Sequence, residues 1–288
     1  MTGLLQLVLG CGGSSSTAPA NPTPAPTPST SFAGFDVSLY PGDASMRAWL
    51  RPASPYDWSG YYFVAPCHRD PSWTGKYATL AAMGWGVTAI YVGQQDWTQI
   101  PAPPPNAAVD PESAPAVAGA SSALVTCSAS LLSSDQGLGE AADAVAKMSA
   151  DGFPPQSTVF LDVEYVTAVT PALLDYYRGW IRGVLADRRF VPGVYAAKSN
   201  ATTLYNAAVD EFRRAGRTDI PAFWIASSVG FTTVSHPTAV GLDFATLWQG
   251  MFDVTQSWAS VTLTVDVDVA TTKSPSAPKP IAISASAR

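Results

Sequence analysis

The sequence predicts an α/β fold, a single-domain (β/α)8 barrel of the TIM type over residues 32–272, and three observations support this prediction. Eight short apolar runs alternate with helical patterns along this stretch. The runs are apolar nearly throughout, which is typical of parallel strands covered on both faces. The alternative, a doubly wound open sheet, usually carries a glycine-rich phosphate-binding fingerprint, and the sequence contains none. The barrel is therefore the favoured architecture.

The strands and helices of this barrel are predicted from local patterns. The clearest helix begins after Thr170, a suitable N-cap, with Pro171 at its first position and apolar residues at three- and four-residue spacing. A second helix is predicted over Gln136–Ala150, and weaker helical patterns cover Trp73–Met83 and Asn200–Ala215. No helix is visible after the sixth strand. The predicted strands are Ala33–Ser38, Tyr61–Ala65, Val87–Gly93, Thr158–Val163, Gly193–Ala196, Ala222–Ala226, Thr246–Gln249 and Leu263–Val269.

Both flanks of the barrel differ from it in composition. Residues 1–11 resemble the end of a bacterial secretion signal, and Val8–Cys11 resembles a lipobox, which predicts an acylated Cys11. The alternative is a frayed apolar terminus with an incidental cysteine. Residues 12–31 contain five prolines and no charge, so they are predicted to form an extended linker. Residues 273–288 are predicted to form a disordered tail.

Composition and charge exclude several classes of protein. Charged residues make up 13% of the chain, too few for a disordered or coiled-coil protein. The 16 Lys and Arg face 22 Asp and Glu without forming a basic cluster in the sequence, which argues against nucleic-acid binding. Two histidines and three cysteines favour neither a metal site nor a cofactor. Cys67 and Cys127 would pair in an oxidising compartment if they lie close together; otherwise they are two separate buried thiols.

Polar side chains gather at the ends of the predicted strands. In barrel enzymes the carboxyl ends of the strands converge at the mouth where the chemistry takes place. An isolated acid there would usually be a helix cap, but polar residues at most of the strands indicate a site. A long Pro- and Ala-rich loop over residues 95–134 is expected to lie over this mouth. The polar residues are Asp36, Gln94, Gln95, Asp162, Glu164, Tyr195, Trp224, Gln249, Asp266 and Asp268.

The sharpest motif is the pair Asp162 and Glu164 at the end of the fourth strand. Residues two apart on a strand point to the same side, so the two carboxyl groups lie close together. Two such groups do not both ionise easily, and one should keep its proton toward neutral pH. A protonated acid beside an ionised one is what glycoside cleavage requires. A metal site is the less favoured alternative because no His or Cys supports it.

Six short motifs occur in the order found in one known family. They span the whole predicted barrel, and the chain resembles the glycoside-hydrolase-like domain once catalogued as domain-of-unknown-function family 1906. That family is similar to the family 25 lysozymes, whose barrels cleave the muramic-acid linkage of peptidoglycan. The motifs are Gly34–Ser38, Phe160–Glu164, Gly193–Tyr195, Phe223–Ala226, Leu247–Gln249 and Val265–Asp268.

The resemblance implies a role for each matching residue. Glu164 would be the general acid, and Asp162 its partner, which orients the N-acetyl group of the substrate or stabilises the positive charge of the transition state. Two differences from the lysozymes stand out: Asp268 replaces an Asn, and Ser227 and Ser228 replace an aromatic residue. Asp36 and Asp266 would be further acids of the cleft, and the expected substrate-binding residues are Gln94, Tyr195, Trp224 and Gln249.

Three functions are therefore compared. The first is an exported glycosidase acting on cell-wall glycan, tethered to the membrane only through Cys11. The second is a non-catalytic carbohydrate-binding or cell-wall-associated protein on the same barrel, since a fold does not guarantee its chemistry. The third, a structural lipoprotein, requires the loop over residues 95–134 to block the mouth. The acid pair favours the first, because a binding module does not need two carboxylates at one bond.

Overall fold

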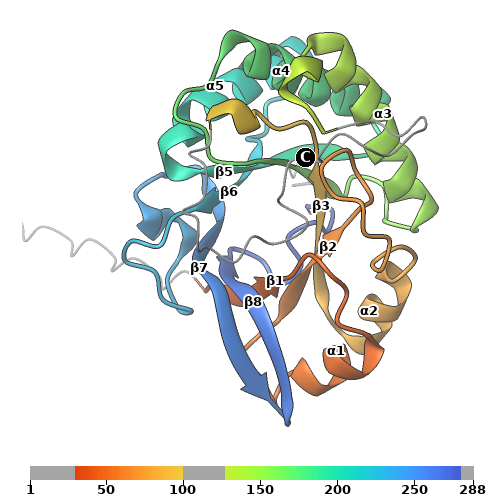
Figure 1. The fold of residues 1–288 in the computed structure, drawn as a ribbon, viewed down its shortest axis with the longest axis vertical. Helices are drawn as coiled ribbons and strands as arrows, with labels where there is room; N and C mark the ends of the chain where they lie inside the picture. The colour runs from red at the N-terminus through yellow and green to blue at the C-terminus, as the bar shows by residue number, and fades with distance from the viewer. Residues whose placement is uncertain (1–29, 100–126, 280–288) are drawn as a thin grey trace, which may run out of the picture.

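The computed structural model describes residues 30–99 and 127–279, which form a closed barrel of eight strands in the order of the sequence (Figure 1). The predicted barrel is confirmed. The lipobox with Cys11 and most of the predicted linker lie outside the described residues. The strands are β1 Phe32–Asp36, β2 Trp58–Tyr62, β3 Gly86–Val92, β4 Thr158–Val163, β5 Val191–Ala197, β6 Ala222–Ala226, β7 Ala245–Trp258 and β8 Val261–Ala270.

The last strand departs from the predicted parallel arrangement. β1 to β7 pair in parallel, whereas β8 is antiparallel to both of its neighbours, β7 and β1. A two-residue turn at Ala259 and Ser260, both with positive φ, joins β7 to β8 as a hairpin. This hairpin extends beyond the other strands in Figure 1. Asp266 and Asp268 therefore do not close a parallel strand: they lie within β8, which runs from the mouth toward the floor of the barrel.

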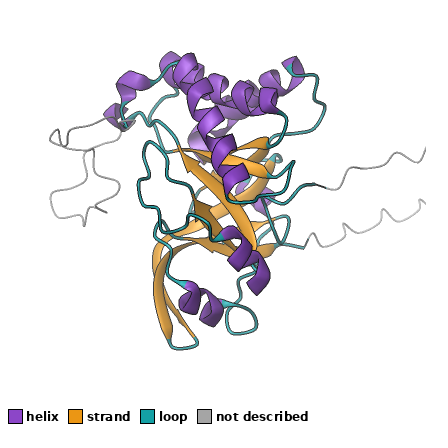
Figure 2. Cartoon of the chain, turned by 90° about the vertical axis from the view of Figure 1, so that its right-hand side faces the viewer, coloured by secondary structure: helices purple, strands orange, loops and turns teal. Residues whose placement is uncertain are grey.

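Helices cover the outside of the barrel (Figure 2). As predicted, the side chain of Thr170 caps α4 by accepting a hydrogen bond from the backbone N–H of Leu173, and Pro171 opens the helix. The short helix α1 was not predicted, and the connection between β6 and β7 contains only a 3₁₀ turn, Pro237–Val240. The helices are α1 Asp43–Trp49, α2 Tyr77–Met83, α3 Ser134–Ala150, α4 Pro171–Asp187 and α5 Lys198–Arg214.

Large aromatic residues fill the inside of the barrel below its mouth. The ring of Trp224 packs edge-on against the rings of Trp58 and Phe160, with centroid distances of 5.8 and 6.0 Å. Gly34 leaves the space that Trp58 occupies, because a Cβ at Gly34 would lie 2.1 Å from the indole ring. This aromatic layer keeps water out from below, so polar groups just above it lie in surroundings of low dielectric constant.

The predicted disordered tail begins too early. Residues 273–279 belong to the fold, because Ser276 inserts between the amino ends of β3 and β4 and is buried. Its backbone N–H donates to the carbonyl of Val87, and its carbonyl accepts from the N–H of Thr158. These strand ends would otherwise have unpaired backbone groups, which explains why the chain continues across them. Among the described residues, no helix is both long and apolar enough to cross a membrane.

Candidate active site

A pocket of about 440 Å³ opens at the carboxyl ends of the barrel strands. A smaller cavity of about 60 Å³ continues from it toward the aromatic layer. Four acids line both spaces: Asp36, Asp162, Glu164 and Asp266. Neither lining includes a Lys or Arg. The pocket therefore holds several carboxyl groups and no basic group, and its floor is apolar.

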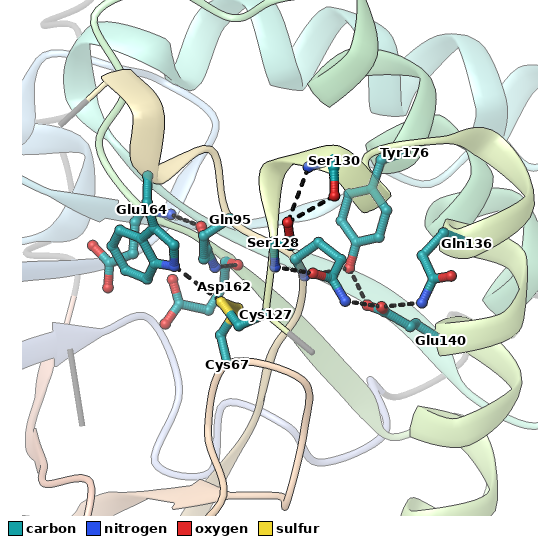
Figure 3. Close-up of a disulfide and its surroundings, with 12 residues drawn as sticks. Cys67, Gln95, Cys127, Ser128, Ser130, Gln136, Glu140, Asp162, Glu164 and Tyr176 are labelled. Carbon is teal, nitrogen blue, oxygen red and sulfur yellow. Dashed lines mark hydrogen bonds between the residues drawn. A yellow bond between two sulfur atoms is a disulfide. The ribbon is translucent and has the colours of Figure 1, made fainter. Parts of the chain in front are cut away.

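The end of β4 carries the acid pair. Asp162 is the second-last residue of the strand and is buried, whereas Glu164 follows the strand and is half-buried nearer the opening. Gln95 holds this strand end in place, because its amide donates to the carbonyl of Asp162 (2.8 Å) and accepts from the N–H of Glu164 (3.1 Å) (Figure 3). One side-chain oxygen of Asp162 is buried without a hydrogen-bond partner among the described residues. Both carboxyl groups face the pocket, as the sequence predicts.

Burial makes both carboxyl groups of the pair weaker acids. Desolvation raises the pKa of Asp162 well above its usual value, and the charges of Glu164 and Asp36 raise it further. Desolvation also raises the pKa of Glu164, with a smaller contribution from the charge of Asp36. Since the two groups titrate together, the proton belongs to the pair rather than to one residue. The site thus retains a proton at a pH where an exposed carboxylic acid would have lost it.

Asp36 and Asp266 lie opposite each other on the paired strands β1 and β8. The Tyr62 hydroxyl donates to Asp36, and the Gln249 amide donates to both Asp36 and Asp266. Burial raises the pKa of Asp36, although the hydrogen bond from Tyr62 opposes the rise. Burial and the charge of Asp36 raise the pKa of Asp266 to about 8. Gln249 therefore links two acids that would otherwise repel each other.

Asp268 lies one layer deeper than Asp266 on the same face of β8 and is fully buried. It accepts a hydrogen bond from Nε1 of Trp224 (3.0 Å), and burial together with the charges of Asp36 and Asp266 raises its pKa well above the usual value. Trp224 is almost completely buried and forms part of the floor of the inner cavity, with the Tyr195 ring packed edge-on against it. These two rings close the site from below.

Gln94 does not reach the pocket, contrary to the sequence-based expectation. Its amide donates to Glu140 of α3 (2.8 Å) and accepts from the N–H of Ser128 (2.8 Å). Glu140 also accepts from Gln136 and from the hydroxyl of Tyr176, so the whole network is turned toward the helices (Figure 3). Gln94 lies two residues after the end of β3, and its contact with Glu140 holds its side chain outward, whereas the side chain of Gln95 lies against the end of β4.

A disulfide between Cys67 and Cys127 closes one wall of the pocket. It joins the loop after β2 to the segment that precedes α3, which are 60 residues apart in the sequence. Trp97, another lining residue, donates a hydrogen bond from Nε1 to the sulfur of Cys127 (2.9 Å). The expected long loop over residues 95–134 falls mainly outside the described residues, but both of its described ends lie at the mouth.

The lining residues that the sequence does not predict include Tyr62, Trp97 and Asp253. The predicted second strand begins three residues late, which places Tyr62 inside the strand although it is the last residue of β2. Asp253 lies on the part of β7 beyond Gln249, where the predicted strand ended. The correct end of β2 identifies Tyr62, whereas Asp253 lies within β7 and is not at a strand end. Within residues 30–99 and 127–279, no group of three His, Cys, Asp or Glu is arranged to hold a metal ion.

A closed barrel with acidic side chains clustered at the C-terminal ends of its strands is typical of a glycoside hydrolase-like protein. The chain belongs to the family described as Rv2525c-like, glycoside hydrolase-like domain, whose model matches residues 47–270. This confirms the resemblance found in the sequence motifs. No curated protein sequence matches the chain.

The chain is similar to several solved structures, and the first two named here have the same fold. An uncharacterised B. stearothermophilus protein has a TM-score of 0.53 and 15% identity, over 83% of this chain and 95% of that one. The modular autolysin LytC from Streptococcus pneumoniae has a TM-score of 0.51 and 9% identity, over 83% of this chain and 46% of that one. The Tat-secreted protein Rv2525c from Mycobacterium tuberculosis has a TM-score of 0.44 and 15% identity, over 83% of this chain and 94% of that one.

Proposed function

We propose that the protein is an exported glycoside hydrolase that cleaves cell-wall glycan of the peptidoglycan type. The observation that carries this proposal is the pair of buried Asp162 and half-buried Glu164, whose raised pKa values keep a proton at the mouth of the pocket. The structure of LytC in complex with a synthetic peptidoglycan ligand, with a TM-score of 0.50 and 9% identity to this chain, supports the substrate class. The family description as glycoside hydrolase-like supports the reaction class.

In this mechanism Glu164 donates the proton to the oxygen of the scissile glycosidic bond. Glu164 is the better donor of the pair because it lies beyond the strand end and nearer the opening, whereas Asp162 is enclosed. As the bond breaks, positive charge develops at the anomeric carbon. In the form of the pair in which Glu164 holds the proton, Asp162 is the carboxylate, and it stabilises that charge strongly because the site is shielded from water. Water then adds to the anomeric carbon and returns a proton to the pair.

The remaining polar groups position the sugar. Asp36 and Asp266 line the same pocket as the pair and are linked through Gln249, and the remaining lone pairs of their oxygens can accept hydrogen bonds from sugar hydroxyls. Tyr195 and Trp224 form the floor beneath it. The inner cavity of about 60 Å³ is too small for a sugar ring, so the ring lies in the outer pocket and places only a substituent below.

The test is the variant Glu164→Gln, which keeps the shape of the side chain but removes the proton that it donates. Turnover of purified peptidoglycan, measured as release of reducing sugar, should fall about 10²–10⁴-fold while glycan binding changes little. Asp162→Asn should lose activity as well, because the developing positive charge is no longer stabilised. The pH profile of the wild type should be bell-shaped, with both limbs belonging to the coupled pair.

Asp175→Asn, an exposed acid on α4, is the matched control and should keep wild-type turnover. If the wild type cleaves glycan and Glu164→Gln cleaves it equally fast, the assignment of the acid is wrong. If the wild type binds glycan and never cleaves it, the protein is a carbohydrate-binding module on the same barrel.

Export is part of the same proposal. The disulfide between Cys67 and Cys127 supports an oxidising compartment outside the cytoplasm. The lipobox at Val8–Cys11 supports a lipid anchor on Cys11, followed by the charge-free linker of residues 12–31. In such an arrangement the linker lets the barrel reach the wall while it remains attached to the membrane.

A further inference from the structure

The outer part of the β7–β8 hairpin carries a face of hydroxyl groups that begins at the rim of the acid site and extends beyond it. Thr255 and Ser257 of β7 and Thr262 and Thr264 of β8 are all exposed. They meet in two cross-strand pairs, Thr255 with Thr264 at 2.9 Å and Ser257 with Thr262 at 2.6 Å between the hydroxyl oxygens. We call these four residues the hydroxyl face.

The hydroxyl face is continuous with the acid site. Side chains two apart on a strand share a face, so Thr264 and Thr262 continue the row that begins with Asp268 and Asp266 inside the barrel. Thr264 itself lines the outer pocket. The same surface therefore passes from the acids to the hydroxyl groups without a change of strand or direction.

The opposite face of the hairpin is fixed to the body of the molecule. Nε1 of Trp49 in α1 donates to the carbonyl of Val261 (3.0 Å), and the hydroxyl of Tyr56 donates to Gln256 (2.7 Å). Trp258 also packs against the core from this side. Because the hairpin is held along its length, the hydroxyl face is preorganised, and a ligand would not have to order it.

We propose that the hydroxyl face binds the glycan strand beyond the sugar at the scissile bond, as an extension of the acid site. This inference rests on the proposed function. A hydroxyl group both donates and accepts hydrogen bonds, as sugar hydroxyls do, and carries no charge to repel the strand. At ~3.4 Å per residue, the four steps along the strand from Asp266 to Thr262 extend the surface by roughly 14 Å, which is longer than one sugar ring. The occupant is thus a polymeric glycan rather than a single sugar.

The test is the double variant Ser257→Ala/Thr262→Val, which removes the outer hydroxyl pair and preserves the shape of the strand. Dissociation constants are measured for one glycan disaccharide unit and for purified strands of several units. The variant should weaken binding of the long strands about tenfold, so the ratio of the two constants moves toward one. A swap, Ser257→Thr/Thr262→Ser, retains both hydroxyl groups and should retain the wild-type ratio.

The control Thr202→Val/Thr203→Val removes two exposed hydroxyl groups from α5, far from the hairpin in the chain, and should keep the wild-type ratio. A thermal unfolding curve of each variant checks that it is folded, and a misfolded Ser257→Ala/Thr262→Val is replaced by Thr262→Val alone. If long and short glycans lose affinity equally or not at all, this inference is wrong while the proposed function stands. If the wild type binds no glycan of any length, both are wrong.

Discussion

At the scale of single residues, the site concentrates acids where they are least easily ionised. Asp36, Asp162, Glu164, Asp266 and Asp268 all have a raised pKa, and in each case the largest cause is desolvation by burial. Such a cluster opposes folding once the groups lose their protons. The barrel therefore tolerates an unfavourable arrangement of charges at the position where the proposed chemistry needs a bound proton.

The variant Asp266→Asn tests whether the ionised acids of the site lower the stability of the folded protein. The pKa of Asp266 rises from 3.8 to about 8 on folding, so between these values the folded state binds more protons than the unfolded state. Its contribution to stability therefore falls as pH rises from 4 to 8. At pH 9 the variant should be more stable than the wild type by at least ~1 kcal/mol, about 2–4 °C in Tm, and the two should converge near pH 4. Asn can keep the hydrogen bond from the N–H of Asp253, and its amide can donate to the free oxygen of Gln249 when the Gln249 amide turns over.

Calorimetric scans of both proteins from pH 4 to pH 9 provide the measurement, with Asp175→Asn as an exposed-acid control. A difference in Tm that is constant across this range would contradict the assignment, because it would show that the charge of Asp266 does not oppose folding.

At the scale of elements, the sequence predicts most strands well and the last hairpin poorly. Thr158–Val163 and Ala222–Ala226 match the structure because both strands are buried on each side and read as continuous apolar runs. The hairpin was missed because its turn, Ala259 and Ser260, lacks the Asn-Gly or Asp-Gly signal that usually marks such a turn. The alternation of Val and polar residues in β8 was the remaining signal of an antiparallel strand.

The same reasoning explains which site residues could be predicted. Asp162, Glu164, Asp36 and Asp266 follow from local strand patterns, and the structure brings all four to one pocket. The outward orientation of Gln94 depends on Glu140 of α3, a residue 46 positions away in the sequence. No local pattern contains that contact, so the sequence alone could not separate Gln94 from Gln95.

The packing of α3 against α4 gives a prediction at this scale. A Cβ on Gly179 of α4 would lie 2.2 Å from the carbonyl oxygen of Ser134 in α3, so Gly179→Ala forces the helices apart. We expect a loss of about 1–3 kcal/mol in the free energy of unfolding, measured with urea. Gly139→Ala is the matched control, because a Cβ there meets nothing within 4 Å, and it should stabilise the helix by up to ~1 kcal/mol. Equal effects of the two substitutions would show that the helices do not depend on this close approach.

At the scale of the whole molecule, the proposed anchor on Cys11 is tested by fractionation. Full-length protein, expressed with a complete export signal, should partition into detergent and remain with the membrane. Cys11→Ser should be released into the aqueous phase, because only the thiol of Cys11 can carry the lipid. Identical partitioning of the two proteins would show that Cys11 carries no anchor, while the barrel and its site would be unaffected.

The antiparallel direction of β8 determines where the chain enters and leaves the barrel relative to the pocket. Phe32 at the start of β1 pairs with Ala270 at the end of β8, so the chain enters and leaves the barrel at neighbouring points on the face opposite the pocket. With a parallel last strand, the chain would instead leave beside the opening. Both connections therefore lie on one side of the molecule, and the opening of the pocket lies on the opposite side. A bead, a fusion partner or a surface attached at either connection leaves the opening directed outward.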